Sequence, residues 1–147
     1  YLHNGGGAPE LKSVARTPYG MRVDYASDPS QTDAGVTGFR SDFTGITMNA
    51  QIFEGTAFTT QFYNTFTPID DERFVLHSRL HIKDSGSAEI NEAIGKAFTD
   101  RFMFEVEQDL KVLDYKRHLV KPRLCAGDGP IHQYRKYAAE FFVSDPA

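Results

Sequence analysis

One carboxylate in the last third of the chain stands among apolar residues. At about 100° per residue, the apolar spacing predicts a helix with a single stripe, made of Phe98, Phe102, Val106, Leu110 and Leu113. Asp109 falls inside this stripe. A carboxylate on a buried face is costly unless a cation meets it. Asp109 is therefore expected to face either a metal ion or an Arg or Lys, and the helix taken alone favours the salt bridge.

Length and composition limit the classes of protein that this chain can represent. Its 147 residues, 40% hydrophobic, suit one folded domain, residues 1–147. The net charge of -4 argues against a nucleic-acid partner. No apolar run approaches the roughly 20 residues of a membrane span. Cys125 is the only cysteine, so no intrachain disulfide can form, and a reducing, cytoplasmic location is expected.

Strand patterns follow one another through the first half of the chain, with short Gly-, Pro- and Asp-containing breaks between them. Such short connections favour neighbouring strands that pair antiparallel in a meander. The predicted strands are Tyr19–Ala26, Val36–Phe43, Ile46–Phe53, Ala57–Thr67 and Arg73–Lys83.

Two helices are predicted after these strands, at about Ala88–His118 and Pro130–Val143. Ser87 is a candidate N-cap for the first, and Asp128-Gly129-Pro130 marks the start of the second. A sheet followed by helices is an α+β layout. An antiparallel sheet wrapped on a long terminal helix leaves a cavity that suits a large apolar ligand.

The most aromatic predicted strand supplies the candidate pocket residues. Alternation places five side chains on one of its faces, namely Phe58, Thr60, Phe62, Asn64 and Phe66. They are expected to line the substrate cavity, with plain core packing as the alternative. His77 and His81 lie about 13 Å apart along a strand, so they cannot bind one metal ion and are expected to face solvent.

Several short motifs, in order, resemble the end of a Rieske non-haem iron oxygenase. They are Phe66-Thr67-Pro68-Ile69-Asp70, then Val106-Glu107-Gln108-Asp109, then Pro122, and then the run from Asp128 to Tyr137. The subgroup that they resemble is the oxygenase component of 3-ketosteroid 9α-hydroxylase. This resemblance implies a helix-grip fold (Bet v 1-like or START-like), in which an antiparallel sheet and long C-terminal helices enclose a cavity.

The resemblance also implies a mononuclear Fe(II) held by two His and one Asp, with open positions for oxygen. Asp109 would be the carboxylate ligand and His3 the second His, so these two are the candidate catalytic and metal-binding residues. The first His of the family motif would precede Tyr1. A Rieske 2Fe-2S cluster needs two Cys and two His, which a chain with one Cys lacks.

The chain is therefore expected to be the catalytic, substrate-binding part of a longer protein, and to be inactive alone. The resemblance implies monooxygenation of a steroid-like or other bulky apolar substrate. The implied partners are the Rieske domain of the parent protein, a reductase or ferredoxin, and further subunits of a homotrimer. The alternative is a metal-free helix-grip module that binds a lipid or sterol, in which Asp109 would pair with an Arg or Lys.

Overall fold

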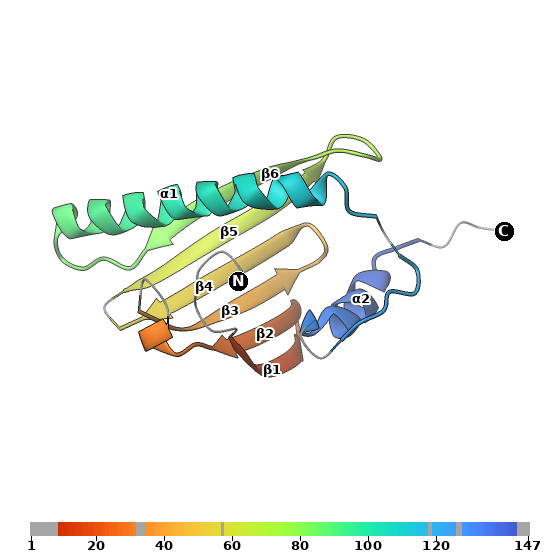
Figure 1. Cartoon of the computed structure of the whole chain (residues 1–147), viewed down its shortest axis with the longest axis horizontal. Helices are drawn as coiled ribbons and strands as arrows, with labels where there is room; N and C mark the ends of the chain where they lie inside the picture. The colour runs from red at the N-terminus through yellow and green to blue at the C-terminus, as the bar shows by residue number, and fades with distance from the viewer. Residues whose placement is uncertain (1–8, 32–34, 57, 118, 126–127, 144–147) are drawn as a thin grey trace.

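The computed structural model describes residues 9–31, 35–56, 58–117, 119–125 and 128–143. Within these ranges the chain forms one antiparallel sheet followed by two helices (Figure 1). The strands lie in the sheet in the order of the sequence, as a meander. The elements are β1 (Glu10–Thr17), β2 (Gly20–Ala26), β3 (Val36–Thr44), β4 (Met48–Gly55), β5 (Thr59–Pro68), β6 (Phe74–Ile82), α1 (Ala88–Leu113) and α2 (Ile131–Ala139), with a short 3-10 turn at Pro29–Gln31.

The two faces of the sheet differ in composition because alternate side chains point to opposite sides. One register row consists of Val23, Ser41, Gln51, Phe62 and Leu80. We call this side the covered face, because both helices pack on it. The opposite side, here the open face, has the neighbouring row of Arg22, Asp42, Ala50, Tyr63 and Arg79.

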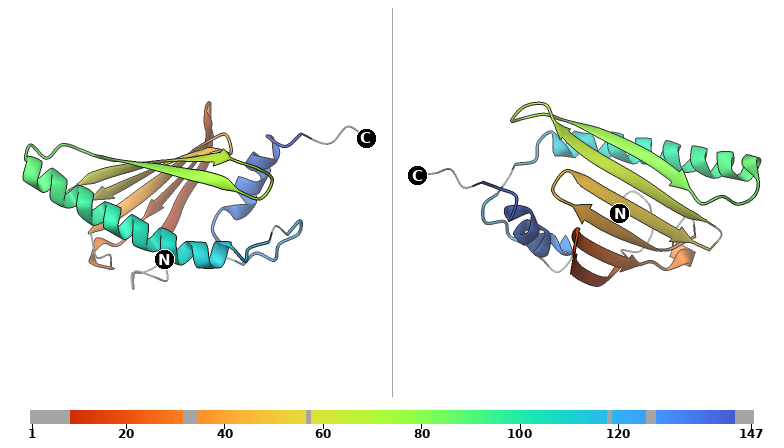
Figure 2. Two further views of the ribbon diagram at one scale, coloured as in Figure 1. Left: turned by 90° about the horizontal axis from the view of Figure 1, so that it is seen from above. Right: turned by 180° about the vertical axis from the view of Figure 1, so that it is seen from behind.

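The open face is polar and carries no helix in the view from behind (Figure 2, right). Arg22 donates two hydrogen bonds to Asp42, at 2.6 and 3.1 Å, across β2 and β3. His77 and His81 are exposed on this face, which confirms their predicted orientation.

The helix α1 covers the β4–β6 half of the sheet (Figure 1). Ser87 caps its start, since the Ser87 hydroxyl accepts a hydrogen bond from the amide of Ile90 at 3.4 Å. Its main aromatic contact is Phe102, whose ring stacks on Phe62 at 4.8 Å between centroids. A Cβ added to Gly95 would lie 2.9 Å from the Ile82 side chain, so the helix approaches β6 closely.

The short helix α2 covers the β1–β3 half and contains the most buried aromatic residue of the described chain. Tyr137 is 2% exposed, and it packs with Met21 and Val23 in the core. Its hydroxyl donates to the carbonyl of Gly45 at 2.9 Å, and the Arg16 guanidinium lies 4.7 Å from its ring centroid. These contacts join α2 to β1, to β2 and to the turn between β3 and β4.

The observed architecture confirms the predicted α+β class and is consistent with a helix-grip fold. Strand bounds agree with prediction to within about two residues, but β1 was not predicted. Both helices are shorter than expected, since α1 ends at Leu113 and α2 at Ala139. Among the described helices, none has the length and apolar character needed to cross a membrane.

Candidate functional site

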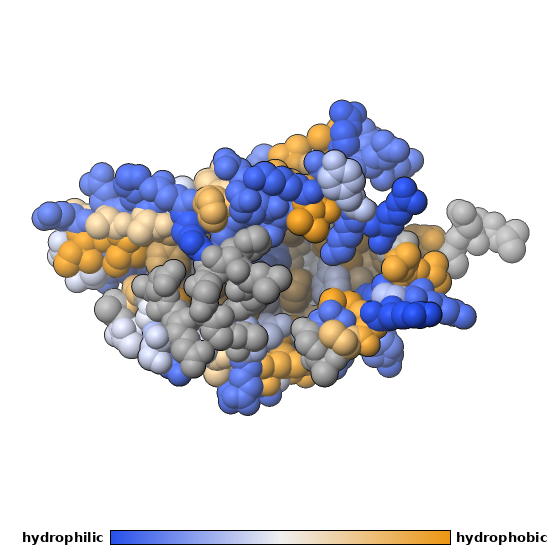
Figure 3. Space-filling model, in the orientation of Figure 1, coloured by the Kyte–Doolittle hydropathy of each residue, from blue (hydrophilic) through white to orange (hydrophobic). Residues whose placement is uncertain are grey.

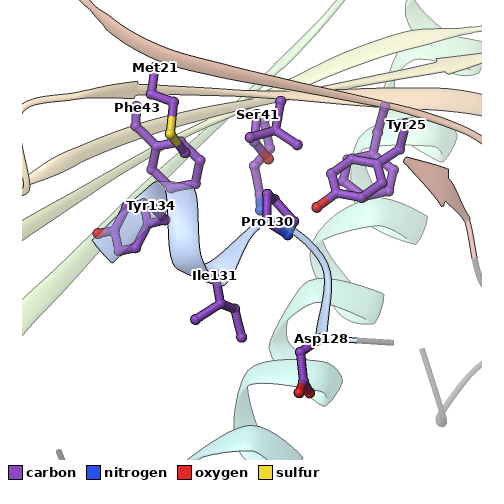
Figure 4. A pocket seen from close by; sticks show the side chains of 11 residues that line it. Met21, Tyr25, Ser41, Phe43, Asp128, Pro130, Ile131 and Tyr134 are labelled. Carbon is purple, nitrogen blue, oxygen red and sulfur yellow. The ribbon is translucent and has the colours of Figure 1, made fainter. Parts of the chain in front are cut away.

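A cavity of about 320 Å³ lies between the covered face of β2–β4 and the start of α2 (Figure 4). Val23, Ser41 and Gln51 are neighbours in register along its floor. Pro130 and Ile131 close it from the helix side. The volume falls at the lower end of the roughly 300–1,000 Å³ range of small-molecule sites.

Flat aromatic rings form the ends of this cavity. Met21, Phe43 and Tyr134 lie at one end, and Tyr25 and Asp128 at the other (Figure 4). The rings of Phe43 and Tyr134 are 4.9 Å apart between centroids. Such walls suit a rigid, flat, apolar ligand better than a flexible polar one.

The Tyr25 end of the cavity continues into a row of stacked rings across the sheet. Tyr25 stacks on Phe39 at 4.5 Å with an interplanar angle of 16°, and Phe39 lies 5.6 Å from Phe53. Burial raises the pKa of the Tyr25 hydroxyl. This phenol therefore stays protonated at neutral pH and can donate a hydrogen bond.

The turn before α2 is stabilised by the side chain of Asp128 and by the backbone conformation of Gly129. The carboxylate of Asp128 accepts a hydrogen bond from the amide of Cys125 at 2.6 Å. Gly129 has a φ of 61°, in the left-handed region that glycine adopts without strain. A Cβ at Gly129 would lie 3.7 Å from the Tyr25 hydroxyl, so this turn closes the Tyr25 end of the cavity.

Four of the predicted pocket residues lie on the covered face of β5 and Phe58 immediately precedes this strand; most of the five pack beneath α1. Phe58 packs edge-on against Phe98 at 5.0 Å, and Phe62 stacks on Phe102. Thr60 is fully buried, and its hydroxyl has no hydrogen-bond partner among the described residues. These contacts are those of core packing, which was the stated alternative for this strand.

The two remaining β5 residues are nearer the end of α1. Asn64 accepts a hydrogen bond from Ser78 at 2.6 Å and is 6% exposed. Phe66 contacts Phe74 at 5.6 Å between centroids. The cavity described above is adjacent to this strand, because Gln51 is the register partner of Phe62, yet its lining contains none of the five predicted residues.

Asp109 does not lie on a buried face, so the expectation of a buried carboxylate was wrong. The residue is exposed, and α1 contains no fully buried residue. The physical reason is that α1 moves away from the sheet towards its C-terminal end (Figure 2, left). Leu110 and Leu113, later in the same stripe, are about half exposed, and apolar surface is visible beside the charged side chains of α1 (Figure 3).

The described residues do not form a complete metal site. Within the described ranges, no group of three or more His, Cys, Asp or Glu side chains could hold a metal ion. His3 lies outside the described residues. The Asp109 carboxylate forms no ion pair or hydrogen bond with the described residues, so it is free to bind one. Asp109 and His3 as metal ligands therefore stay predictions.

Comparison with known protein families assigns the chain to one family. The family described as "3-Ketosteroid 9alpha-hydroxylase C-terminal domain" matches residues 11–142. This match spans nearly the whole sheet and both helices, and the chain belongs to this family.

Curated relatives agree with the assignment. Two proteins of Rhodococcus rhodochrous, each named "3-ketosteroid-9-alpha-monooxygenase, oxygenase component", are 28% identical over 94 residues and 29% identical over 93 residues. These matches cover 63% and 62% of this chain. They cover only 25% and 24% of the relatives, so the match accounts for about a quarter of each relative's length. No solved structure matches the chain significantly.

The residues that line the described cavity were missed at the sequence level, although a signal for them was present. Tyr25, Phe39 and Ser41 alternate along β2 and β3 in the same way as the residues chosen on β5. Aligning the faces of the predicted meander would have placed them beside Gln51 on the covered face.

Proposed function

We propose that this chain is the substrate-binding and Fe(II)-binding domain of a Rieske-type monooxygenase that acts on a steroid-like substrate. Family membership supports the proposal, because the relatives are named as oxygenase components of a 3-ketosteroid monooxygenase. The observation that carries it is a flat-walled apolar cavity on the same sheet face that α1 covers.

The chain's own residues bind and orient the substrate in this proposal. The rings of Tyr25, Phe43 and Tyr134 exclude water and restrict a flat ligand to one plane. The bound molecule extends from this cavity along the covered face towards Asn64 and Phe66 on β5. Holding one carbon in a fixed position is the main contribution that a protein makes to this kind of chemistry.

Asp109 and His3 are the proposed metal ligands of this chain, with a further His from elsewhere in the parent protein. An Fe(II) ion held by two His and one carboxylate supplies oxygen activation when bound. The free Asp109 carboxylate on α1 supports its place in this set. Its exposure is compatible with a ligand that meets its partners only in the whole protein.

The proposed partners are suggested by family membership and by the part of each relative that the match does not cover. A Rieske domain with its 2Fe-2S cluster would deliver electrons, supplied in turn by a reductase or ferredoxin. A homotrimer would place the cluster of one subunit near the iron of the next. Without these partners we expect the chain to show no turnover.

The metal-free lipid-binding or sterol-binding module remains the second candidate, but a specific observation counts against it. That reading requires Asp109 to pair with an Arg or Lys. The described residues contain no such pair.

Iron analysis of the protein expressed from its full reading frame tests the proposal. Asp109→Asn should lower the iron content at least several-fold, because it removes a carboxylate ligand while leaving the exposed helix surface intact. Glu107→Gln is the matched control, since Glu107 is another exposed carboxylate on α1. Equal iron content in the two variants would contradict the assignment of Asp109.

A further inference from the structure

The strand β6 forms the upper edge of the sheet in Figure 1. Among the described strands it pairs only with β5. The amide of Lys83, directly after β6, donates to the carbonyl of Thr59 on β5 at 2.9 Å. Because the direction of backbone hydrogen bonds alternates along an antiparallel strand, every second residue of β6 points its N–H and C=O groups away from β5. These residues are Phe74, Leu76, Ser78, Leu80 and Ile82.

The opposite edge of the sheet is protected in a way that β6 is not. β1 is interrupted by a register shift between Leu11 and Ser13, and its Lys12 and Arg16 form ion pairs. β6 has 9 residues and no proline, and its pairing with β5 has no register shift. Natural sheets protect a long edge by bulges, prolines, charges or a covering segment. β6 lacks the first two of these devices.

The helix α1 leaves most of this edge uncovered. All side chains from Phe74 to Arg79 are exposed, and those of Phe74, Val75 and Leu76 are 57%, 38% and 37% exposed. An uncovered edge with apolar side chains is a template for aggregation. We therefore expect another segment to cover it permanently in the whole protein.

The side chains of β6 indicate the chemistry of that segment. No Asp or Glu occurs between Phe74 and Lys83. Neither Arg79 nor Lys83 has an ion-pair partner among the described residues. Opposite charges on directly opposed residues stabilise a strand pair. A strand beside β6 would therefore gain most from carboxylates on the open face, which bears His77, Arg79 and His81, and from apolar residues on the covered face.

A second copy of β6 does not supply these carboxylates. Two copies paired antiparallel about Ser78 would place Arg79 opposite His77. Pairing about Arg79 would place this residue opposite itself, and like charges that face each other destabilise a strand pair. The charges of β6 thus disfavour a continuous sheet across two copies.

We propose that β6 pairs with an extended acidic segment of the parent protein, from a part of its chain outside these 147 residues. The curated matches cover only about a quarter of each relative's length, so such proteins contain ample further chain. A segment of the same chain covers the edge permanently because its effective concentration is high. The inference is independent of the proposed substrate and metal ligands, and shares with them only a longer parent protein.

Amide hydrogen exchange at single-residue resolution, on the protein expressed from its full reading frame, tests the pairing. The amides of His77 and Arg79 point to β5 and should exchange slowly in any case. On a covered edge, the outward amides of Leu76, Ser78 and Leu80 should exchange within about tenfold of these neighbours. An alternating pattern, with the outward amides close to the rate of an unfolded chain, would overturn the proposal.

Charge reversal at Arg79 tests the acidic character of the segment. Arg79→Glu should speed exchange at Ser78 and Leu80 several-fold, because it sets two carboxylates opposite each other. Lys12→Glu is the matched control, since it reverses an exposed charge on the other edge strand. Arg79→Gln carries the test if Arg79→Glu does not fold. Equal effects of the Arg79 and Lys12 changes would overturn the charge complementarity.

Carbodiimide cross-linking followed by peptide mapping identifies the source of the segment. The reagent joins the Lys83 amine to a carboxylate in contact with it. We expect a cross-linked peptide from the same polypeptide, outside these 147 residues, with the mass of a single chain on a denaturing gel. A cross-link to a second copy or to a different protein would overturn this assignment. All three negative results leave the proposed substrate and metal ligands standing.

Discussion

Replacing Phe62 by Ala should remove the main contact between the sheet and α1. The Phe62 side chain is 5% exposed. Its ring stacks on Phe102 at 4.8 Å and meets the edge of Phe53 at 6.1 Å. Buried Phe→Ala changes cost about 3–5 kcal/mol. Since the free energy of unfolding of a domain is about 5–15 kcal/mol, this single change should remove a large part of it.

Urea unfolding followed by far-UV circular dichroism measures this loss, because the chain has no Trp for fluorescence. With a slope of about 2 kcal/mol per molar urea, the midpoint should fall by roughly 2 M. The slope itself should stay constant if the variant folds to the same structure.

Phe104→Ala provides the control for this substitution. Phe104 is on α1 and 49% exposed, and its ring meets the Arg101 guanidinium at 5.7 Å. Its removal should cost about 1 kcal/mol or less. If Phe62→Ala lowered the midpoint no more than Phe104→Ala, the packing of α1 on the covered face would be refuted.

Two further predictions concern the turns of the sheet. A Cβ at Gly20 would lie 1.8 Å from the backbone oxygen of Phe43, so Gly20→Ala should prevent stable folding. Gly45 has a φ of 60° and open space around it, so Gly45→Ala should lower the free energy of unfolding by only about 1–2 kcal/mol. A similar melting temperature for the two variants would contradict this prediction. The Arg73 side chain lowers the pKa of Asp70, so the stability that Asp70 adds is complete above an unfolded pKa of about 3.9 and is lost as pH falls through the lower folded pKa. Asp70→Asn should therefore flatten the acid side of a plot of unfolding midpoint against pH, and an unchanged profile would exclude this coupling.

The sheet could largely be predicted from the sequence because apolar and polar residues alternate along its strands and its connections are short. Ser87 as the cap of α1 and the order of the meander were confirmed for the same local reasons. The first strand was missed because Glu10–Thr17 is an edge strand with mostly exposed residues. An edge strand of this kind shows little hydrophobic contrast between its two faces.

The candidate site was less predictable because it depends on where the helices cross the sheet. A helical stripe identifies residues that share one side, but not the point at which the sheet beneath them ends. Asp109 follows Phe102 on the stripe, yet it lies beyond the close contact with β5. In the same way, the alternation of side chains identified the sheet face on which Phe62 lies. It did not identify the part of that face on which α1 packs, or the part beside α2 where the cavity remains.

Photo-crosslinking with a light-activated ketosteroid tests most directly whether the covered face is the ligand site. Peptide mapping after irradiation should place the label on cavity residues such as Met21, Phe43 or Tyr134, and excess unlabelled ketosteroid should suppress it. Label on the open face, at His77 or His81, or label that the competitor leaves unchanged, would contradict a ligand site between the sheet and its helices.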